Sequence, residues 1–290
     1  MATLRDIKKR IQSVKNTMQI TRAMKLVAAA KMRRAQEIVL ASRPYASKML
    51  EVLMSLAAST REEAHPLLAK RNEKNILILL CSSDKGLCGP FNANLFRAVT
   101  NLIRENEGKG IFMTAVGRKG NDFFKNKNVV MQKTYPDYFR NLGYPLAAGI
   151  GREMVEIFTQ EKVDKIYLVY NHFVSVINQD VIVRSLLPIE SPQQEEDGFD
   201  AETGANYLYE PSAETILSDI LVKHVEVQVH QALLESWASE NGARMAAMDN
   251  ATRNAGEMID TLTLQYNRAR QTAITNELIE IVSGADALKV

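Results

Sequence analysis

The fold is decided by residues 4–39, which read LRDIKKRIQSVKNTMQITRAMKLVAAAKMRRAQEIV. Positions at alternating steps of three and four residues form one narrow seam along a helix, and an apolar seam faces a second helix in a coiled coil. Nine of the eleven seam positions are apolar, whereas an apolar content of 46% would give about five. The positions are Leu4, Ile7, Ile11, Val14, Met18, Thr21, Lys25, Ala28, Met32, Ala35 and Val39. The spacing therefore predicts a long coiled-coil helix.

The same spacing returns more than 200 residues later. Eight of the ten seam positions there are apolar. They are Met245, Met248, Thr252, Ala255, Ile259, Leu262, Tyr266, Ala269, Ala273 and Asn276. Alanines on both seams allow two helices to approach closely, so we expect the first and last helices to pair with each other.

Sequence signals predict where the first helix begins and how far it runs. Thr3 supplies an N-cap and Asp6 an acidic third position. No Pro or Gly follows before Pro44, so a helix over residues 4–43 would be about 60 Å long.

The last helix has its own signals. We expect Pro211 and Ser212 to begin it and Gly284 to end it. Residues 213–283 would extend for roughly 105 Å. A helix of that length cannot be buried in a 290-residue globule, so it must project.

Thr21 and Lys25 interrupt the first seam. One interpretation is a register shift in an imperfect coiled coil, and the other is that this stretch faces a partner protein. The sequence leaves both open.

Composition and charge limit the class of protein. A charged content of 24% and a net charge of +2 are typical of a soluble chain, and no apolar run is long enough for a transmembrane helix. Cys81 and Cys88 are too few for a disulfide framework and have the wrong spacing for metal ligation, so we expect reduced thiols in a cytosolic protein. Although the N-terminal stretch is basic, its continuous heptads favour mature structure over a transit peptide.

Charge is unevenly distributed along the chain. Residues 1–40 carry a net charge of +8, and residues 188–205 carry −6 and are expected to form a loop. The basic stretch could bind nucleic acid or an acidic protein, or it could be a solvated helix face. It lacks the interleaved aromatic residues that stack on bases, which counts against nucleic acid.

The middle of the chain changes period. Apolar runs at 76–80, 111–116, 166–170 and 181–187 predict strands, and helical patterns occur at 91–105, 118–125 and 146–160. Strands that alternate with helices predict an α/β domain with a mainly parallel sheet.

The loop after the first strand, SSDKGLCGP at 82–90, lies where doubly wound folds bind phosphates, but it matches neither glycine-rich nucleotide motif. Gly86 and Gly89 are better explained as turn residues that need positive φ. The histidines His65, His172, His224 and His230 have no metal-ligand spacing, and no catalytic set stands out. We therefore expect no cofactor, no metal and no small-molecule substrate.

Five segments resemble the γ subunit family of rotary ATP synthases. ITNELIEIVSGADA at 274–287 is similar to its C-terminal signature, and the N-terminal runs at 7–11 and 20–29 resemble its first helix. SDKGLCG at 83–89 resembles its central-domain loop, and YLYEP at 207–211 its foot.

The resemblance implies a central stalk. The first and last helices, within 1–60 and 211–290, would form an antiparallel coiled coil, and 70–205 would form a Rossmann-like domain. The coiled coil would sit inside a ring of three α and three β subunits, with the ε subunit and the membrane c ring near the α/β domain. Rotation of the c ring would change the β subunits' nucleotide affinity, and the chain itself would not be an enzyme. The location implied is the cytoplasmic face of a bacterial inner membrane, as part of the F1 sector.

The resemblance also implies residue roles. Contacts with β fall on Met24, Lys25, Arg244, Arg270, Gln271 and Thr275. An apolar tip for a bearing in the ring falls on Leu278, Ile279, Ile281 and Val282. Contacts of the foot with the c ring fall on Tyr207 and Glu210. Two other functions stay open: a nucleic-acid-binding coiled coil, whose affinity would fall steeply with salt, and a dinucleotide enzyme.

Overall fold

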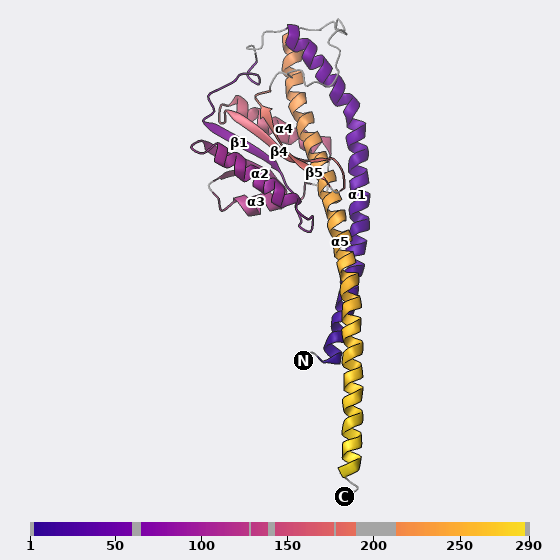
Figure 1. Ribbon diagram of the computed structural model, residues 1–290. Coiled ribbons are helices and arrows are strands. Elements are labelled where there is room, and N and C mark those ends of the chain that lie inside the picture. The colour runs from indigo at the N-terminus through magenta and orange to yellow at the C-terminus, as the bar shows by residue number, and fades with distance from the viewer. Residues whose placement is uncertain are drawn as a thin grey trace. The chain divides into compact units, whose positions relative to one another are not determined.

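The computed structural model describes residues 3–59, 65–127, 129–138, 143–176, 178–189 and 213–287 (Figure 1). The elements in chain order are α1 Leu4–Ser59, β1 Asn75–Cys81, α2 Phe91–Glu105, β2 Gly110–Val116, α3 Arg118–Phe124, β3 Val130–Tyr135, α4 Tyr144–Thr159, β4 Lys165–Phe173, β5 Gln179–Leu187 and α5 Ala213–Ala287. The chain divides into two compact units, Met1–Ala28 with Met245–Val290, and Ala29–Arg244. Helices α1 and α5 contribute residues to both units.

The larger unit is built on one sheet with the strand order β3-β2-β1-β4-β5. The first four strands of this order are parallel, and β5 pairs with β4 in the antiparallel direction. All four predicted strands and all three predicted helices of the middle region are present. Each predicted helix end lies within two residues of the observed one. The predicted mainly parallel α/β fold is confirmed.

Two apolar cores cover the two faces of this sheet. On one face Ile76, Ile78 and Leu80 of β1 pack with the buried residues of α2 and with Phe124 of α3. On the other face Leu77 and Leu79 pack with α4, α5 and Leu53 of α1. Because β1 is buried on both sides, it reads as a continuous apolar run, which is why the sequence revealed it.

The sequence did not reveal β3. Its residues are all exposed or half-buried, and its register with β2 shifts between Met113 and Thr114. A short edge strand with polar residues gives no apolar run for a pattern to detect.

In the smaller unit, α1 and α5 pair in antiparallel directions. The Thr21 and Thr252 hydroxyl oxygens lie 2.7 Å apart, and Lys25 Nζ lies 2.6 Å from Asp249 Oδ1. As the position on α1 rises by four, the position on α5 falls by three, as two antiparallel helices require.

The predicted seam is the contact surface of this pair. From Leu4 to Ala28 every seam position of α1 is buried or half-buried, and most positions between them are exposed. The same is true of α5 from Met245 to Ala269. Seven-residue spacing in the sequence therefore located the interface correctly at both ends of the chain.

The helix ends agree with the sequence only in part. The Thr3 amide donates to Asp6 Oδ2 at 3.1 Å and the Asp6 amide donates to the Thr3 hydroxyl at 3.3 Å, so the predicted cap is confirmed. The side-chain hydrogen bond from Thr3 lowers the pKa of Asp6.

Both long helices continue past the residues at which the sequence allowed them to end. Helix α1 runs through Pro44 to Ser59, and α5 runs through Gly284 to Ala287. Pro44 is exposed, so the carbonyl that loses its helical donor can be hydrated instead. A helix already several turns long also adds one glycine at a cost of only about 1 kcal/mol.

We predict that Gly117→Ala destabilises the larger unit by about 3 kcal/mol, because φ is +91° there and an added Cβ would lie 2.2 Å from the Ser82 carbonyl oxygen. Gly108→Ala is the matched control. Its φ is +95°, but no atom lies within 4 Å of the added Cβ, so it should cost only about 1 kcal/mol. Urea unfolding of both variants measures the difference, and equal losses would show that the contact with Ser82 is unimportant.

Candidate functional site

The loop between β1 and α2 is held by its own hydrogen bonds. The Ser83 hydroxyl donates to the Lys85 carbonyl at 2.8 Å. Asp84 Oδ1 accepts from the backbone amides of Arg118 and Asp137 at 3.2 and 3.0 Å. The Ser83 hydroxyl and the amides of Arg118 and Asp137 are therefore already engaged within the domain.

The turn chemistry of this loop differs from expectation at one of its two glycines. Gly89 has a φ of +56°, as predicted. Gly86 is not among the residues with positive φ, and Leu87 takes the left-handed conformation instead, with a φ of +62°. Leu87 is 65% exposed, so the loop presents an apolar side chain to the surface.

Helix α5 lies across the carboxyl ends of β1 and β4. The Ser236 hydroxyl donates to the Cys81 carbonyl at 3.0 Å, and the Ser239 hydroxyl donates to the Asn171 carbonyl at 3.1 Å. The strand order reverses between these two strands, which is where doubly wound folds bind nucleotides. Since α5 occupies this position with fully buried serines, the dinucleotide interpretation loses its expected site.

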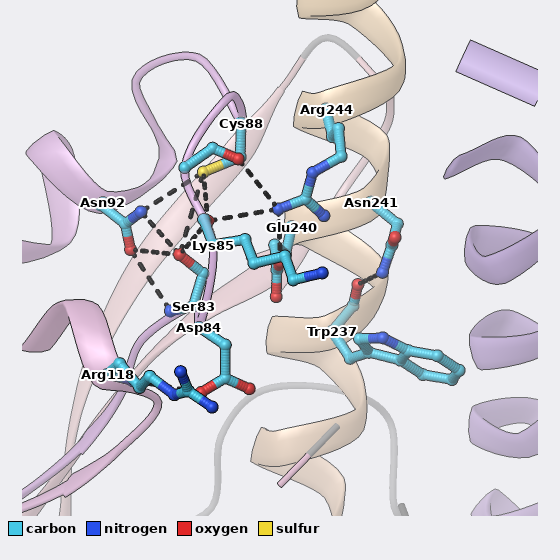
Figure 2. A network of polar contacts seen from close by, with 11 residues as sticks. Ser83, Asp84, Lys85, Cys88, Asn92, Arg118, Trp237, Glu240, Asn241 and Arg244 are labelled. Atoms are coloured by element: carbon cyan, nitrogen blue, oxygen red, sulfur yellow. Dashed lines mark hydrogen bonds and ion pairs between the residues drawn. The ribbon is translucent and has the colours of Figure 1, made fainter. Parts of the chain in front are cut away.

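Arg244 connects α5 to the β1–α2 loop (Figure 2). Its guanidinium lies 2.6 Å from Glu240 Oε1 and 3.3 Å from the carbonyl oxygens of both Lys85 and Gly86. Burial raises the pKa of Glu240, although the charge of Arg244 opposes this. The Arg244 side chain is only 14% exposed, so it is directed into its own domain.

Sequence reasoning selected Arg244 but missed Glu240. The two residues are four apart on one helix, a spacing at which opposite charges meet. That signal could have identified the pair. The role of Arg244 as a contact with another subunit stays a prediction.

The two cysteines are free and buried. Burial raises the pKa of both thiols, so the reactive thiolate is disfavoured at either position. The Cys88 sulfur also accepts a hydrogen bond from the Asn92 amide at 3.3 Å.

Thr21 and Lys25 form a polar layer in the coiled coil. Thr21 is buried and its hydroxyl contacts that of Thr252, and Lys25 pairs with Asp249 on the same facing helix. The hydrogen bond from Lys25 lowers the pKa of Asp249. The seam continues in register through Ala28, so the register-shift interpretation is wrong.

Met24 lies beside this layer and is half-buried, and the Lys25 side chain keeps 36% of its area exposed. Both therefore retain surface that another protein can contact. Whether they contact β stays a prediction.

The end of α5 extends past the start of α1. The pairs Thr21–Thr252 and Lys25–Asp249 have residue numbers that add to 273 and 274, so Leu4, where α1 begins, lies opposite position 269 or 270. Residues 271–287 consequently form an overhang of roughly 25 Å, with no α1 residue opposite them. Two positions of the predicted seam, Ala273 and Asn276, fall in this overhang.

The overhang and the residue before it carry most of the predicted contact residues. Arg270, Gln271 and Thr275 are exposed, and the Thr275 hydroxyl donates to the Gln271 carbonyl of the same helix. The four predicted tip residues are between 57% and 67% exposed: Leu278, Ile279, Ile281 and Val282. At 100° per residue they spread over about 160° of the helix, and Glu277 and Glu280 lie on the remaining side.

The predicted foot residues Tyr207 and Glu210 lie outside the described residues, as do Pro211, Ser212 and most of the acidic stretch. Within the described ranges, no helix is long and apolar enough to cross a membrane. The same ranges contain no group of three or more potential metal ligands.

These features define a class of protein. It is a mainly parallel α/β domain whose usual ligand position is filled by its own helix, together with terminal helices that pair as an antiparallel coiled coil. The family model described as ATP synthase matches residues 3–288.

Relatives agree along the whole length. The ATP synthase gamma chain of Geobacter metallireducens is 53% identical over 291 residues, and that of Moorella thermoacetica is 48% identical over 289, with all of both chains covered each time. The chain belongs to the ATP synthase gamma chain family. As a member, it is a stalk subunit of the ATP synthase complex and not a catalytic one.

Solved structures show the same fold. A chain in the central stalk and c-ring structure of the Tetrahymena thermophila mitochondrial ATP synthase is 28% identical, with a TM-score of 0.59 over 80% of this chain and 99% of that one. A chain of the Euglena gracilis enzyme is 21% identical, with a TM-score of 0.69 over 98% of this chain and 94% of that one.

We predict that Thr21 and Thr252 couple across the seam by about 1 kcal/mol in a double-mutant cycle with valine, because valine keeps the shape of threonine and removes the hydroxyl. Urea unfolding followed by helical circular dichroism measures the coupling. Thr263 is the control partner, since its hydroxyl donates only to the Ile259 carbonyl of its own helix. A Thr21–Thr252 coupling as small as that of Thr21–Thr263 would contradict the prediction.

Proposed function

We propose that this chain is the central rotor shaft of a bacterial F-type ATP synthase. In this role it couples proton-driven rotation of a membrane c ring to conformational cycling of catalytic β subunits, for ATP synthesis or hydrolysis. It contributes no catalytic group of its own. The overhang of α5 is the observation that carries the proposal.

The overhang is suited to turning inside a ring. Its four tip residues expose apolar surface over nearly half of the circumference of a single helix, and apolar contacts have no fixed direction that would hold the helix at one angle. Exposed apolar surface on this scale favours burial by a partner. An apolar collar formed by the upper ends of three α and three β subunits would supply that burial.

The contacts with β are proposed for the residues just below the tip. Arg270, Gln271 and Thr275 are exposed on the helix, and a guanidinium forms strong but exchangeable hydrogen bonds with carboxylates. Met24 and Lys25 add surface on α1. Arg244 acts indirectly in this proposal, by fixing the β1–α2 loop and its exposed Leu87.

Asymmetry gives these contacts their effect. A pair of helices has no threefold symmetry, so three β subunits around it each meet a different face. Each β subunit is then stabilised in a different conformation with a different affinity for nucleotide. A rotation by one third of a turn exchanges the three states.

The coiled coil must also transmit force without one helix sliding along the other. The polar layer resists sliding, because a shift would separate the Thr21 and Thr252 hydroxyls and the Lys25–Asp249 pair. Single polar positions fix register in other coiled coils in the same way.

The remaining partners are proposed from the family. Tyr207 and Glu210 would contact the c ring, and the ε subunit would lie near the α/β domain. The chain would then be a peripheral protein on the cytoplasmic face of the inner membrane, as part of the F1 sector.

Native mass spectrometry of the tagged chain, purified gently from its own membranes, tests the proposal. We expect one copy in a particle with three copies each of two larger subunits. A free dimer or co-purified nucleic acid would overturn the shaft assignment.

Truncation tests the tip. We predict that removal of residues from Glu277 onward weakens retention in that particle about tenfold or more, because four large apolar side chains lose their burial. The single Trp237 is buried in the α/β unit, so its fluorescence should stay unchanged and report intact folding there.

The control is removal of residues 288–290 alone, which leaves the tip residues in place. If the longer truncation were retained as well as this control, the assignment of the tip to a bearing would be wrong.

A further inference from the structure

The sheet has two edges, and one of them is protected against pairing with another chain. Strand β3 at the first edge has only six residues, a register shift against β2, and the exposed polar residues Gln132 and Lys133. Short length, irregular register and a lysine on the edge strand are three ways by which proteins prevent strand addition.

Strand β5 at the other edge lacks most of this protection. It has nine residues, with the apolar stretch Val181–Ile182–Val183 at its centre and neither Lys nor Pro. Its register with β4 is regular from Gln179 to Ser185, and the only shift lies beyond, toward Leu187. Val183 is 41% exposed, and within the described residues no strand pairs with the outer edge of β5.

A cavity of about 270 Å³ opens beside this edge, between the sheet and α5. Its polar lining includes Tyr170, His172, Arg184, Gln228, Gln231 and Glu235. His172 Nδ1 and Glu235 Oε2 lie 2.5 Å apart, so these two groups are engaged with each other.

Arg184 is the other charged side chain that lines this cavity, beside Glu235. It is exposed on β5 and forms no hydrogen bond or ion pair within the described residues. Its charge also acts on neighbours: burial and then Arg184 lower the pKa of His224 to about 4, and Arg184 opposes the rise in the pKa of Tyr170. An acidic group placed beside Arg184 would supply the ion pair that it lacks within the described residues.

We propose that β5 is a docking edge, at which an extended segment of a partner protein adds as a sixth strand and places an Asp or Glu side chain opposite Arg184. Main-chain hydrogen bonds to the free edge would provide affinity. The acidic side chain would provide specificity, because opposite charges on directly paired strands attract each other.

The geometry limits the partner segment. The regular part of β5, Gln179 to Ser185, accepts a strand of about seven residues, or roughly 23 Å. Side chains alternate between the two faces, so the partner needs an acidic residue toward the cavity and apolar residues next to Val181 and Val183 on the opposite face.

Site-specific crosslinking in the assembled complex tests the docking edge. A photoreactive amino acid at Val183 should crosslink to an extended segment of another subunit, with an Asp or Glu within two residues of the crosslinked position. The same group at Val130, which is 58% exposed on the protected edge β3, is the control and should give no extended-segment crosslink. Crosslinks from position 183 that stay within this chain, that reach a second copy of it, or that are absent would each overturn the proposal.

A charge reversal tests the specificity. Arg184→Glu should weaken retention of the crosslinked subunit about tenfold in a salt-wash series. Arg97→Glu on the exposed face of α2 makes the same charge change elsewhere in the unit and should have no effect. Equal losses of the crosslinked subunit in the two variants would indicate a general charge effect and would contradict the role of Arg184.

This inference extends the proposed function, and the two can fail separately. If the particle with three copies each of two larger subunits forms but β5 gives no crosslink, only the docking edge is wrong. If β5 crosslinks to an acidic strand in a different complex, the docking edge stands and the shaft does not.

Discussion

The packing of α5 against the sheet is the contact on which the larger unit depends. Among the described residues, α4 and α5 cover most of one face of β1 and β4, and α5 supplies Leu217, Leu221, Val225, Val229 and Leu233 to that core. These residues come from the last third of the chain, so the sheet cannot complete its core until the C-terminal helix is in place. The domain therefore folds only when the long helix is present. Contacts between residues so far apart in the sequence are also costly in chain entropy.

The same packing explains why a nucleotide-type fold can serve without a nucleotide. Ser236 and Ser239 donate to the carbonyls at the ends of β1 and β4, and so satisfy groups that would otherwise face an open crevice. Arg244 does the same for the loop carbonyls of Lys85 and Gly86. The helix thus takes the place that a ligand has in related folds, and a binding crevice becomes a contact between the sheet and the protein's own helix.

The sequence predicted the parts of the fold that depend on burial alone. Strands such as β1, with both faces covered, and seams such as Leu4 to Ala28 must be apolar at fixed spacing, so their positions can be counted. The sequence did not predict the features in which water or a polar partner, and not apolar burial, satisfies a residue. Strand β3 is half exposed, Pro44 lies on a solvated helix face, and Thr21 and Lys25 sit in the seam because they find polar partners on α5. Polar partners of this kind are 224 and 231 residues away, and no local pattern indicates them.

The overhang of α5 illustrates how a helix can be ready for a partner in advance. A helix that continues from an existing coiled coil needs no new nucleus, so residues 271–287 can stay helical without α1 beside them. The unfavourable free energy of this segment comes from the exposure of its apolar side chains and not from the ordering of its backbone. These side chains are Leu278, Ile279, Ile281 and Val282. A partner that buries these side chains therefore gains the apolar contact without the entropy loss of folding a flexible segment. Apolar contacts are also non-directional, so they leave the helix free to rotate. A set of fixed hydrogen bonds at the tip would prevent rotation.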